Sequence, residues 1–291
     1  MSEGREGDAG RAAAAAPAGV RTATLRADDG ARLAYDDAGA GRAVVLVHGF
    51  PQSRRYWHPQ LAALPAGVRA LAPDLRGFGD SEPRAPLSLD RHADDLVALL
   101  DHVGVARAVV CGLSMGGYVA LALWRRHPAR VRALVLADTR AGADDAAGRA
   151  RRDALVALAR REGSAAVADT QLAGSLGRTT REREPARVAA FRALLSAAPV
   201  EGIVGALLAM RDRPDATATL PTIAVPTLVL VGAEDVLTPV DEARRLAAGI
   251  VGARLAVIDG AGHASSWERP AAFTAELAAF VLALPPSPDD G

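Results

Sequence analysis

The sequence contains a single cysteine, no lysine and no asparagine, and only 4% of its 291 residues are aromatic. One thiol, Cys111, excludes an internal disulfide framework and any metal site built from several thiolates, and it fits a reducing compartment. The 34 basic residues balance 34 acidic ones, so the chain has no net charge with which to attract phosphate backbones or anionic lipid. We therefore expect neither nucleic acid nor a membrane as a partner.

Long apolar runs are also absent. Arg, Asp or Glu interrupts every candidate before it reaches the roughly 20 residues that a membrane-spanning helix needs. Residues 1–10 include three acids, and Pro17 breaks the weakly apolar stretch that follows, so this region makes a poor signal peptide. We expect a soluble, cytoplasmic protein with a disordered tail at residues 1–18 and a short C-terminal tail at residues 286–291.

Half of the residues are hydrophobic (50%), and many of them form short runs that end in Gly, Asp or His. Continuous apolar runs of this kind are typical of strands buried on both faces of a parallel sheet. Segments with helical spacing lie between them, and a turn separates the alternating segments Val20–Arg26 and Ala31–Tyr35. The pattern predicts an α/β fold in which a hairpin precedes a mostly parallel, doubly wound sheet. The expected strands lie within 43–49, 68–75, 106–114, 131–139, 226–235 and 253–263.

The strand rhythm stops after Thr139 and resumes only with the run PTLVLVG. Helical periodicity and many charges fill the interval, which predicts an inserted helical unit with a break at Gly163. The expected helices span about 144–162, 164–173, 183–198 and 201–212. The predicted organisation is a core of residues 19–139 and 219–285 that carries a helical cap of residues 140–218.

The segment Gly112-Leu113-Ser114-Met115-Gly116 fits the pattern Gly-x-Ser-x-Gly. An apolar strand leads into Ser114 and a helix-compatible stretch follows it, which predicts the sharp turn that holds a nucleophilic hydroxyl clear of a sheet. The alternative is a serine helix cap among small residues. Cys111 precedes this turn on the strand, so we expect a small buried side chain and not a nucleophile.

A serine hydroxyl becomes a nucleophile when a base takes its proton, and the base needs an anion to fix its tautomer. Asp235 ends the apolar run LVLVGAED, and His263 follows the last expected strand in a glycine-rich loop. Glu234 is expected to point the other way along an extended chain, whereas Asp138, after the preceding strand, stays open as an alternative acid. The three residues follow one another along the chain in the order Ser114, Asp235, His263.

Metal and cofactor motifs are lacking. The histidines show no paired spacing with an acid that would suit a metal ion, and no G-x-G-x-x-G fingerprint follows a strand. We therefore expect no metal and no other cofactor.

Together with HGFP at 48–51 and DLRGFGDS at 74–81, these motifs resemble the serine branch of the α/β-hydrolase family, from about Val20 to Leu284. The resemblance implies that the backbone N–H groups of Phe50 and Met115 form an oxyanion hole. It also implies that residues of the cap shape a substrate pocket. Apolar side chains expected to face the catalytic edge are Leu155, Leu158, Phe191, Leu194, Leu207 and Met210, with the charged residues between them in water.

Two aromatic residues are further candidates for the pocket. Tyr118 follows the serine turn, and Trp267 follows His263, where many family members carry smaller residues. Trp267 is expected either to narrow the pocket or to pack at the start of a helix.

Within the family, the segments HGFPQSRRYW, GLSMGGYVA and GAGH…WERP look most similar to small carboxylesterases and enol-lactonases, such as the 3-oxoadipate enol-lactonase group. The resemblance implies hydrolysis of a small carboxylic ester or lactone through an acyl-enzyme. Cofactor-free haloperoxidases or perhydrolases and C–C bond hydrolases, with similar motifs, are the alternatives, and a non-catalytic ligand-binding homologue is a third. Dehalogenases and epoxide hydrolases of this fold carry an aspartate where this chain has Ser114. Natural substrate and oligomeric state stay open.

Overall fold

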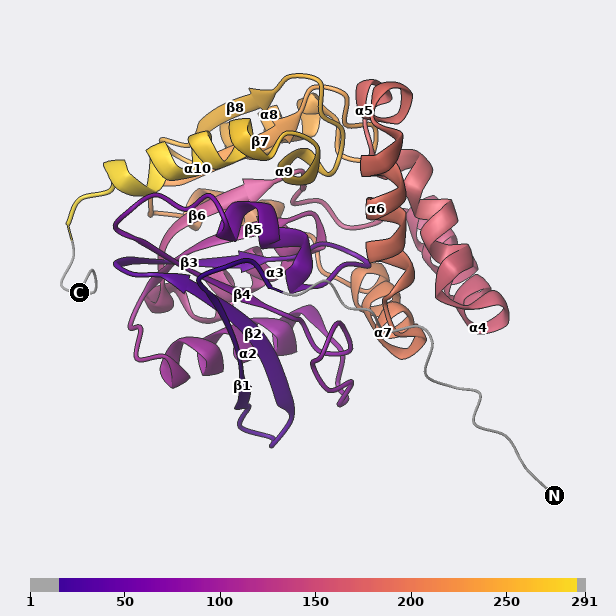
Figure 1. The fold of residues 1–291 in the computed structure, drawn as a ribbon, viewed down its shortest axis with the longest axis horizontal. Coiled ribbons are helices and arrows are strands. Elements are labelled where there is room, and N and C mark those ends of the chain that lie inside the picture. The colour runs from indigo at the N-terminus through magenta and orange to yellow at the C-terminus, as the bar shows by residue number, and fades with distance from the viewer. Residues whose placement is uncertain (1–15, 287–291) are drawn as a thin grey trace.

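The computed structural model describes residues 16–286, so most of the two expected tails lies outside the described residues. Its centre is one eight-stranded sheet with the order β1-β2-β4-β3-β5-β6-β7-β8 (Figure 1). β1 and β2 form the predicted antiparallel hairpin, β2 pairs antiparallel with β4, and every later pairing is parallel. The strands are β1 Val20–Arg26, β2 Arg32–Gly39, β3 Arg42–Val47, β4 Val68–Pro73, β5 Ala108–Leu113, β6 Val131–Ala137, β7 Thr227–Gly232 and β8 Arg254–Ile258.

Successive side chains of the central strands enter different halves of the core. In β3, Val45 and Val47 belong to one buried cluster and Val44 and Leu46 to the other. Because side chains alternate between the faces of a sheet, a continuous apolar run is what two covered faces require. The predicted α/β fold with a mostly parallel, doubly wound sheet is confirmed.

Helices cover both faces of this sheet. The cluster on one face includes residues of α2, α3 and α8, and the cluster on the other includes residues of α1 and α10. The helices are α1 His58–Leu61, α2 Leu89–His102, α3 Met115–Arg126, α4 Ala146–Ser175, α5 Arg178–Arg183, α6 Pro185–Ser196, α7 Val200–Arg211, α8 Val240–Gly249, α9 Ser265–Glu268 and α10 Pro270–Ala283. Short 3-10 turns occur at Arg54–Trp57, Pro128–Arg130 and Thr217–Thr222.

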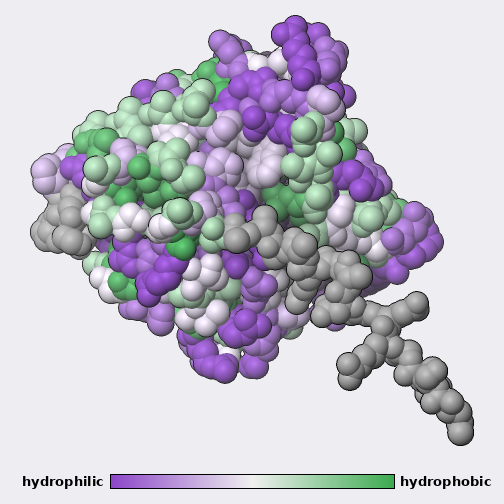
Figure 2. All heavy atoms as spheres, in the orientation of Figure 1, coloured by the Kyte–Doolittle hydropathy of each residue, from purple (hydrophilic) through white to green (hydrophobic). Residues whose placement is uncertain are grey.

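Four of these helices, α4 to α7, lie between β6 and β7 in the chain and group together at one end of the molecule, at the right of Figure 1. The break predicted at Gly163 is present inside α4, where φ is 79° and ψ is −173°, a conformation that favours glycine. Sequence analysis did not predict α5, because Arg178–Arg183 is too short and too polar to show an apolar period. Hydrophilic side chains cover much of the outer surface of this end (Figure 2).

Within residues 16–286, no single helix is long and apolar enough to cross a membrane. The two helices α6 and α7 reach the required length and composition only as a pair, and they meet at an angle of 90°.

The carboxyl ends of the parallel strands deliver the polar residues of the site to one edge of the sheet. Phe50 follows β3, Ser114 follows β5, Asp138 follows β6, Asp235 follows β7 and His263 follows β8. Ligands of open α/β sheets bind at this edge, since the loops there carry side chains that the buried strands cannot.

Candidate active site

Ser114 occupies a strained turn between β5 and α3. Its φ of 52° and ψ of −112° lie in a region that side chains rarely adopt. A Cβ at Gly112 would collide with the Gly116 carbonyl, and a Cβ at Gly116 would collide with the Val47 carbonyl. The glycines of the Gly-x-Ser-x-Gly pattern are therefore required by close backbone contact, which explains their spacing around the serine.

A chain of hydrogen bonds joins the three residues that the sequence singled out. His263 Nε2 lies 2.8 Å from Ser114 Oγ, and His263 Nδ1 lies 2.9 Å from Asp235 Oδ2. The turn after Asp235 holds its carboxylate: the N–H groups of Leu237 and Thr238 donate to Oδ1 at 2.8 and 2.9 Å. Serine, imidazole and carboxylate are thus aligned for proton transfer.

Thr238 is a part of this arrangement that sequence analysis missed. Its hydroxyl donates to Asp235 Oδ2 at 2.7 Å and lies 3.2 Å from His263 Nδ1. The spacing of Asp235 and Thr238 could have indicated this contact. When an aspartate ends a strand, a threonine three residues later can reach back to its carboxylate in a side-chain turn. Thr238 fixes the orientation of Asp235 toward the imidazole.

The electrostatics favour a charged Asp235 beside a basic His263. Burial raises the pKa of the Asp235 carboxyl, but the His263 ring and the hydrogen bonds from Thr238 lower it further, below its usual range. Burial lowers the pKa of His263, but the Asp235 carboxylate raises it more, so the imidazole is a stronger base than usual. An imidazole with this neighbour can accept the proton of Ser114.

Asp138, the alternative acid, is fully buried but is not hydrogen-bonded to His263. Its Oδ1 accepts from the Gly232 N–H at 2.9 Å, and its Oδ2 accepts from the Ser265 hydroxyl at 2.5 Å. Burial, together with the Asp235 carboxylate, raises the pKa of Asp138 well above its usual value. Asp138 connects β6 to the loops that carry Asp235 and His263.

The two backbone donors implied by the family resemblance lie beside Ser114. Met115 is the first residue of α3, so its N–H has no acceptor within the helix. Phe50 lines the same cavity as Ser114 and His263, and its N–H forms no hydrogen bond with another described residue. The positive end of the α3 dipole adds to the attraction for an oxyanion.

A family model described as alpha/beta hydrolase fold matches residues 42–270. The chain belongs to the alpha/beta hydrolase fold family.

Several members of the alpha/beta hydrolase family are similar over most of the chain. A thermophilic esterase from Thermogutta terrifontis, solved with malate bound, is 36% identical, with a TM-score of 0.86, and the match covers 90% of this chain and 98% of that one. The enol-lactonase of Burkholderia xenovorans LB400 is 32% identical, with a TM-score of 0.82, over 89% and 100% of the two chains. BpoC, a candidate non-heme bromoperoxidase of Mycobacterium tuberculosis, is 33% identical over 87% of this chain and 98% of its own length.

A cavity of about 220 Å³ opens onto Ser114 and His263. Tyr118 lines it, as expected of a pocket residue. Trp267 does not: its ring stacks on Tyr56, with centroids 5.9 Å apart, and packs against Phe191 at 5.7 Å. The expectation that Trp267 narrows the pocket is therefore wrong, and its alternative role in packing describes it.

The expected lining by apolar cap side chains is only partly found. Leu155 and Met210 line the cavity, together with the polar Gln171 and Ser175, which sequence analysis did not name. Hydrophobic spacing identifies the buried face of a helix but not the element that covers it. The other four apolar candidates lie in or against the hydrophobic core: Leu158, Phe191, Leu194 and Leu207. No charged residue between these apolar positions lines the cavity, but four that precede Leu155 do, and sequence analysis did not name them: Arg140, Asp144, Arg151 and Arg152.

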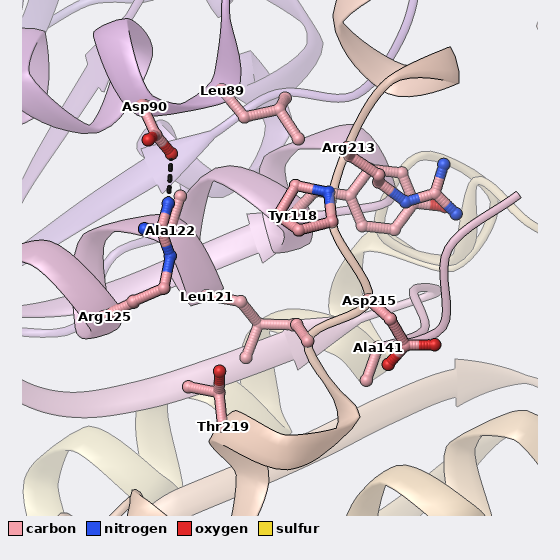
Figure 3. A pocket seen from close by; sticks show the side chains of 12 residues that line it. Leu89, Asp90, Tyr118, Leu121, Ala122, Arg125, Ala141, Arg213, Asp215 and Thr219 are labelled. Carbon is pink, nitrogen blue, oxygen red and sulfur yellow. Dashed lines mark hydrogen bonds and ion pairs between the residues drawn. The ribbon is translucent and has the colours of Figure 1, made fainter.

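A second cavity, of about 140 Å³, shares Tyr118 with the first (Figure 3). The guanidinium of Arg213 lies over the Tyr118 ring, 4.1 Å from its centroid, and both residues line this second cavity. Asp90 and Arg125 form an ion pair on its other side, drawn as the dashed line in Figure 3. Neither Ser114 nor His263 lines it, so it is separate from the reacting groups.

Glu268 ties the loop of His263 to the inserted helices. Its carboxylate is buried and accepts from the Gly262 N–H at 2.7 Å and from the Gly177 N–H at 2.8 Å. Gly262 directly precedes His263, and Gly177 directly precedes α5. The two backbones approach so closely that a Cβ on either glycine would meet the other residue's nitrogen. Glu234, next to Asp235, makes a parallel link to the N–H and hydroxyl of Thr179.

We expect Glu268→Gln to lower both stability and kcat. An amide has one acceptor oxygen and would turn its NH₂ toward one of the two N–H donors, which costs about 1–3 kcal/mol in a buried site. The loop before His263 would then lose its link to α5. Thermal unfolding and kcat for 4-nitrophenyl butyrate measure the two effects.

Glu276→Gln is the matched control for this variant, because Glu276 pairs with Arg254 at the protein surface, where such pairs contribute little. A Glu268→Gln enzyme with the stability and kcat of the control would show that the link does not position His263.

Proposed function

We propose that this chain hydrolyses a small carboxylic ester or lactone through an acyl-enzyme, with Ser114, His263 and Asp235 as its catalytic triad. Ser114 Oγ attacks the carbonyl carbon while His263 Nε2 takes its proton. The C–O bond then breaks, and His263 gives the proton to the leaving alcohol. Water attacks the acyl-enzyme with His263 again as the base, and Ser114 leaves with the proton restored.

The observation that carries this proposal is the continuous hydrogen-bonded chain from Asp235 through His263 to Ser114 at the carboxyl edge of the sheet. Each tetrahedral intermediate places a negative charge on the former carbonyl oxygen. The N–H groups of Phe50 and Met115 are the proposed donors to that oxygen, and removing one such donor in comparable enzymes costs about 10²–10³ in kcat. The similarity to an esterase and an enol-lactonase supports the same reaction class.

Residues 140–218 are the proposed cap of this site. They contribute Leu155, Gln171 and Met210 to the cavity that opens onto Ser114, so they bound the space for the acyl group or the leaving alcohol. The chemistry itself stays with residues from the loops of the sheet.

A perhydrolase is the second candidate, favoured by the similarity to BpoC. Its first half-reaction is the same acylation of Ser114, after which hydrogen peroxide replaces water as the attacking group. The two activities therefore differ in the second nucleophile and not in the triad.

A fluorophosphonate probe tests the proposal directly. We expect stoichiometric labelling at Ser114, together with turnover of 4-nitrophenyl esters or lactones and little peroxide-dependent halogenation. Absence of labelling would identify the protein as a ligand-binding homologue. Halogenation that exceeds hydrolysis would favour the perhydrolase.

A further inference from the structure

The side chains that line the catalytic cavity carry more positive than negative charges. Among the described residues of its wall, Arg140, Arg151 and Arg152 are cations, and Asp144 is the sole acid. The chain as a whole carries a formal net charge of +0, so this excess is not a consequence of composition. A cavity with low-dielectric walls concentrates such a field and attracts ligands of the opposite charge.

Asp144 does not neutralise this excess. Its buried carboxylate accepts from Arg140 at 2.6 Å and from Arg152 at 3.0 Å, and Arg213 lies 3.0 Å from the same group. Burial raises the pKa of Asp144, but the neighbouring arginines lower it more, so the carboxyl is charged at neutral pH. One negative charge is thus shared by three guanidinium groups, so Asp144 and its three arginines keep a net positive charge.

Two donors on this wall have no partner among the residues that the structure describes. Arg140 Nε is buried and has no hydrogen-bond acceptor among the described residues. Arg151 is exposed and makes no hydrogen bond or ion pair within residues 16–286. Buried donors are nearly always satisfied in folded proteins, and an unpaired guanidinium beside one can take the oxygens of a bound anion.

The position of Arg151 on α4 directs it to the site. Gly148, Arg151, Arg152 and Leu155 all line the cavity, and this spacing marks one face of a helix. Ser114 and His263 line the same cavity. An anion bound by Arg151 would therefore share one cavity with the carbonyl that Ser114 attacks.

We infer that the substrate carries a free carboxylate besides its ester or lactone group, and that Arg151 and Arg140 bind this carboxylate. The inference rests on the proposed function and adds the substrate class to it. Guanidinium groups hold carboxylates through short, charge-assisted and often bidentate hydrogen bonds. The carboxylate selects the substrate, and the triad acts on the ester.

Two pairs of alkyl esters test this inference. The first compares monoethyl adipate with ethyl adipamate, in which a carboxamide replaces the carboxylate on the acyl side. The second compares 6-(butanoyloxy)hexanoate with its amide and so places the charge on the alcohol side. In at least one pair we expect kcat/KM to be about tenfold higher or more for the carboxylate, as suits hydrogen bonds to a charged group. Raising the salt concentration should narrow the difference.

Variants of Arg151 test whether this side chain causes the preference for the carboxylate substrate. Arg151→Gln should reduce the ratio of kcat/KM between the carboxylate and the amide substrate about fivefold or more. Arg151→Lys, which keeps the charge but loses the planar pair of donors, should reduce this ratio less than Arg151→Gln does. Arg160→Gln is the matched control. Arg160 is exposed on the same helix and lies nine residues further on, on the opposite side at roughly 100° per residue, so its loss should leave the ratio unchanged.

The outcomes separate this inference from the proposed function. Equal kcat/KM within both pairs overturns the inference, and so does a preference for the carboxylate that Arg151→Gln leaves intact. In either case, hydrolysis of the ester bond in the substrates that carry an amide still supports the proposed function. Failure to hydrolyse any of the four esters, with no probe labelling of Ser114, overturns both.

Discussion

Ser114→Ala is expected to reduce kcat for ester hydrolysis by about 10⁴-fold or more, because the triad acts as a unit and its nucleophile is then missing. The melting temperature should change by no more than about two degrees, since the hydroxyl makes a single hydrogen bond among the described residues, to His263. The strained turn depends on the glycines around it and on the Ser114 N–H, which donates to the Ala137 carbonyl at 2.9 Å. Alanine retains both.

Steady-state hydrolysis of 4-nitrophenyl butyrate and a thermal melt on the same preparation measure these two expectations. Ser196→Ala serves as the control, because the Ser196 hydroxyl donates only to the Arg192 carbonyl of its own helix. Activity of the Ser114→Ala enzyme above a few per cent of the unmodified protein would remove Ser114 from the mechanism.

The parts of this protein that the sequence predicts well are those set by local patterns. A sheet covered on both faces requires strands with continuous apolar runs. The turn at Ser114 requires glycines where two backbones come into contact. Both requirements can therefore be recognised in the sequence. The loop residues Asp235 and His263 were found in the same way, as polar residues that end buried strands.

The wall of the cavity could not be predicted, because it depends on how distant elements pack. The spacing of Arg151, Arg152 and Leu155 shows that they share a face of α4, but not that this face turns toward Ser114. Assigning apolar residues to the pocket and charged ones to water followed the usual rule for helices. That rule gives no role to the charged residues before Leu155, four of which line the cavity.

Glu268 illustrates a second kind of residue that sequence patterns miss. It lies in the segment WERP after His263, where sequence analysis gave it no role, yet its carboxylate joins Gly262 to Gly177, 85 residues away in the chain. Its role exists only once α5 has packed against the loop of His263. The carboxylates of Glu268 and Glu234 therefore link the inserted helices to the loops that carry His263 and Asp235.

Asp235→Asn is expected to lower kcat/KM by about 10³–10⁴, far more than Asp138→Asn. An asparagine can hold the wrong imidazole tautomer and cannot stabilise the imidazolium. The pH profile should change as well. The Asp235 carboxylate raises the pKa of His263, and the base works only when unprotonated, so activity of the unmodified enzyme falls as the pH drops through that raised pKa. Without the carboxylate, this fall should move to lower pH.

Asp138→Asn provides the contrast, because the Asp138 carboxyl accepts hydrogen bonds from Gly232 and Ser265 and not from the His263 imidazole. The pKa of its carboxyl is raised toward the neutral form, which an amide resembles, and the amide oxygen can still accept from the Gly232 N–H. We expect less than about a tenfold loss in kcat/KM and an acid limb at its original pH. Profiles of kcat/KM between pH 5 and 9 for both variants, with melting temperatures to confirm folding, decide the matter. A larger loss and a shifted limb in Asp138→Asn would make Asp138 the acid of the triad.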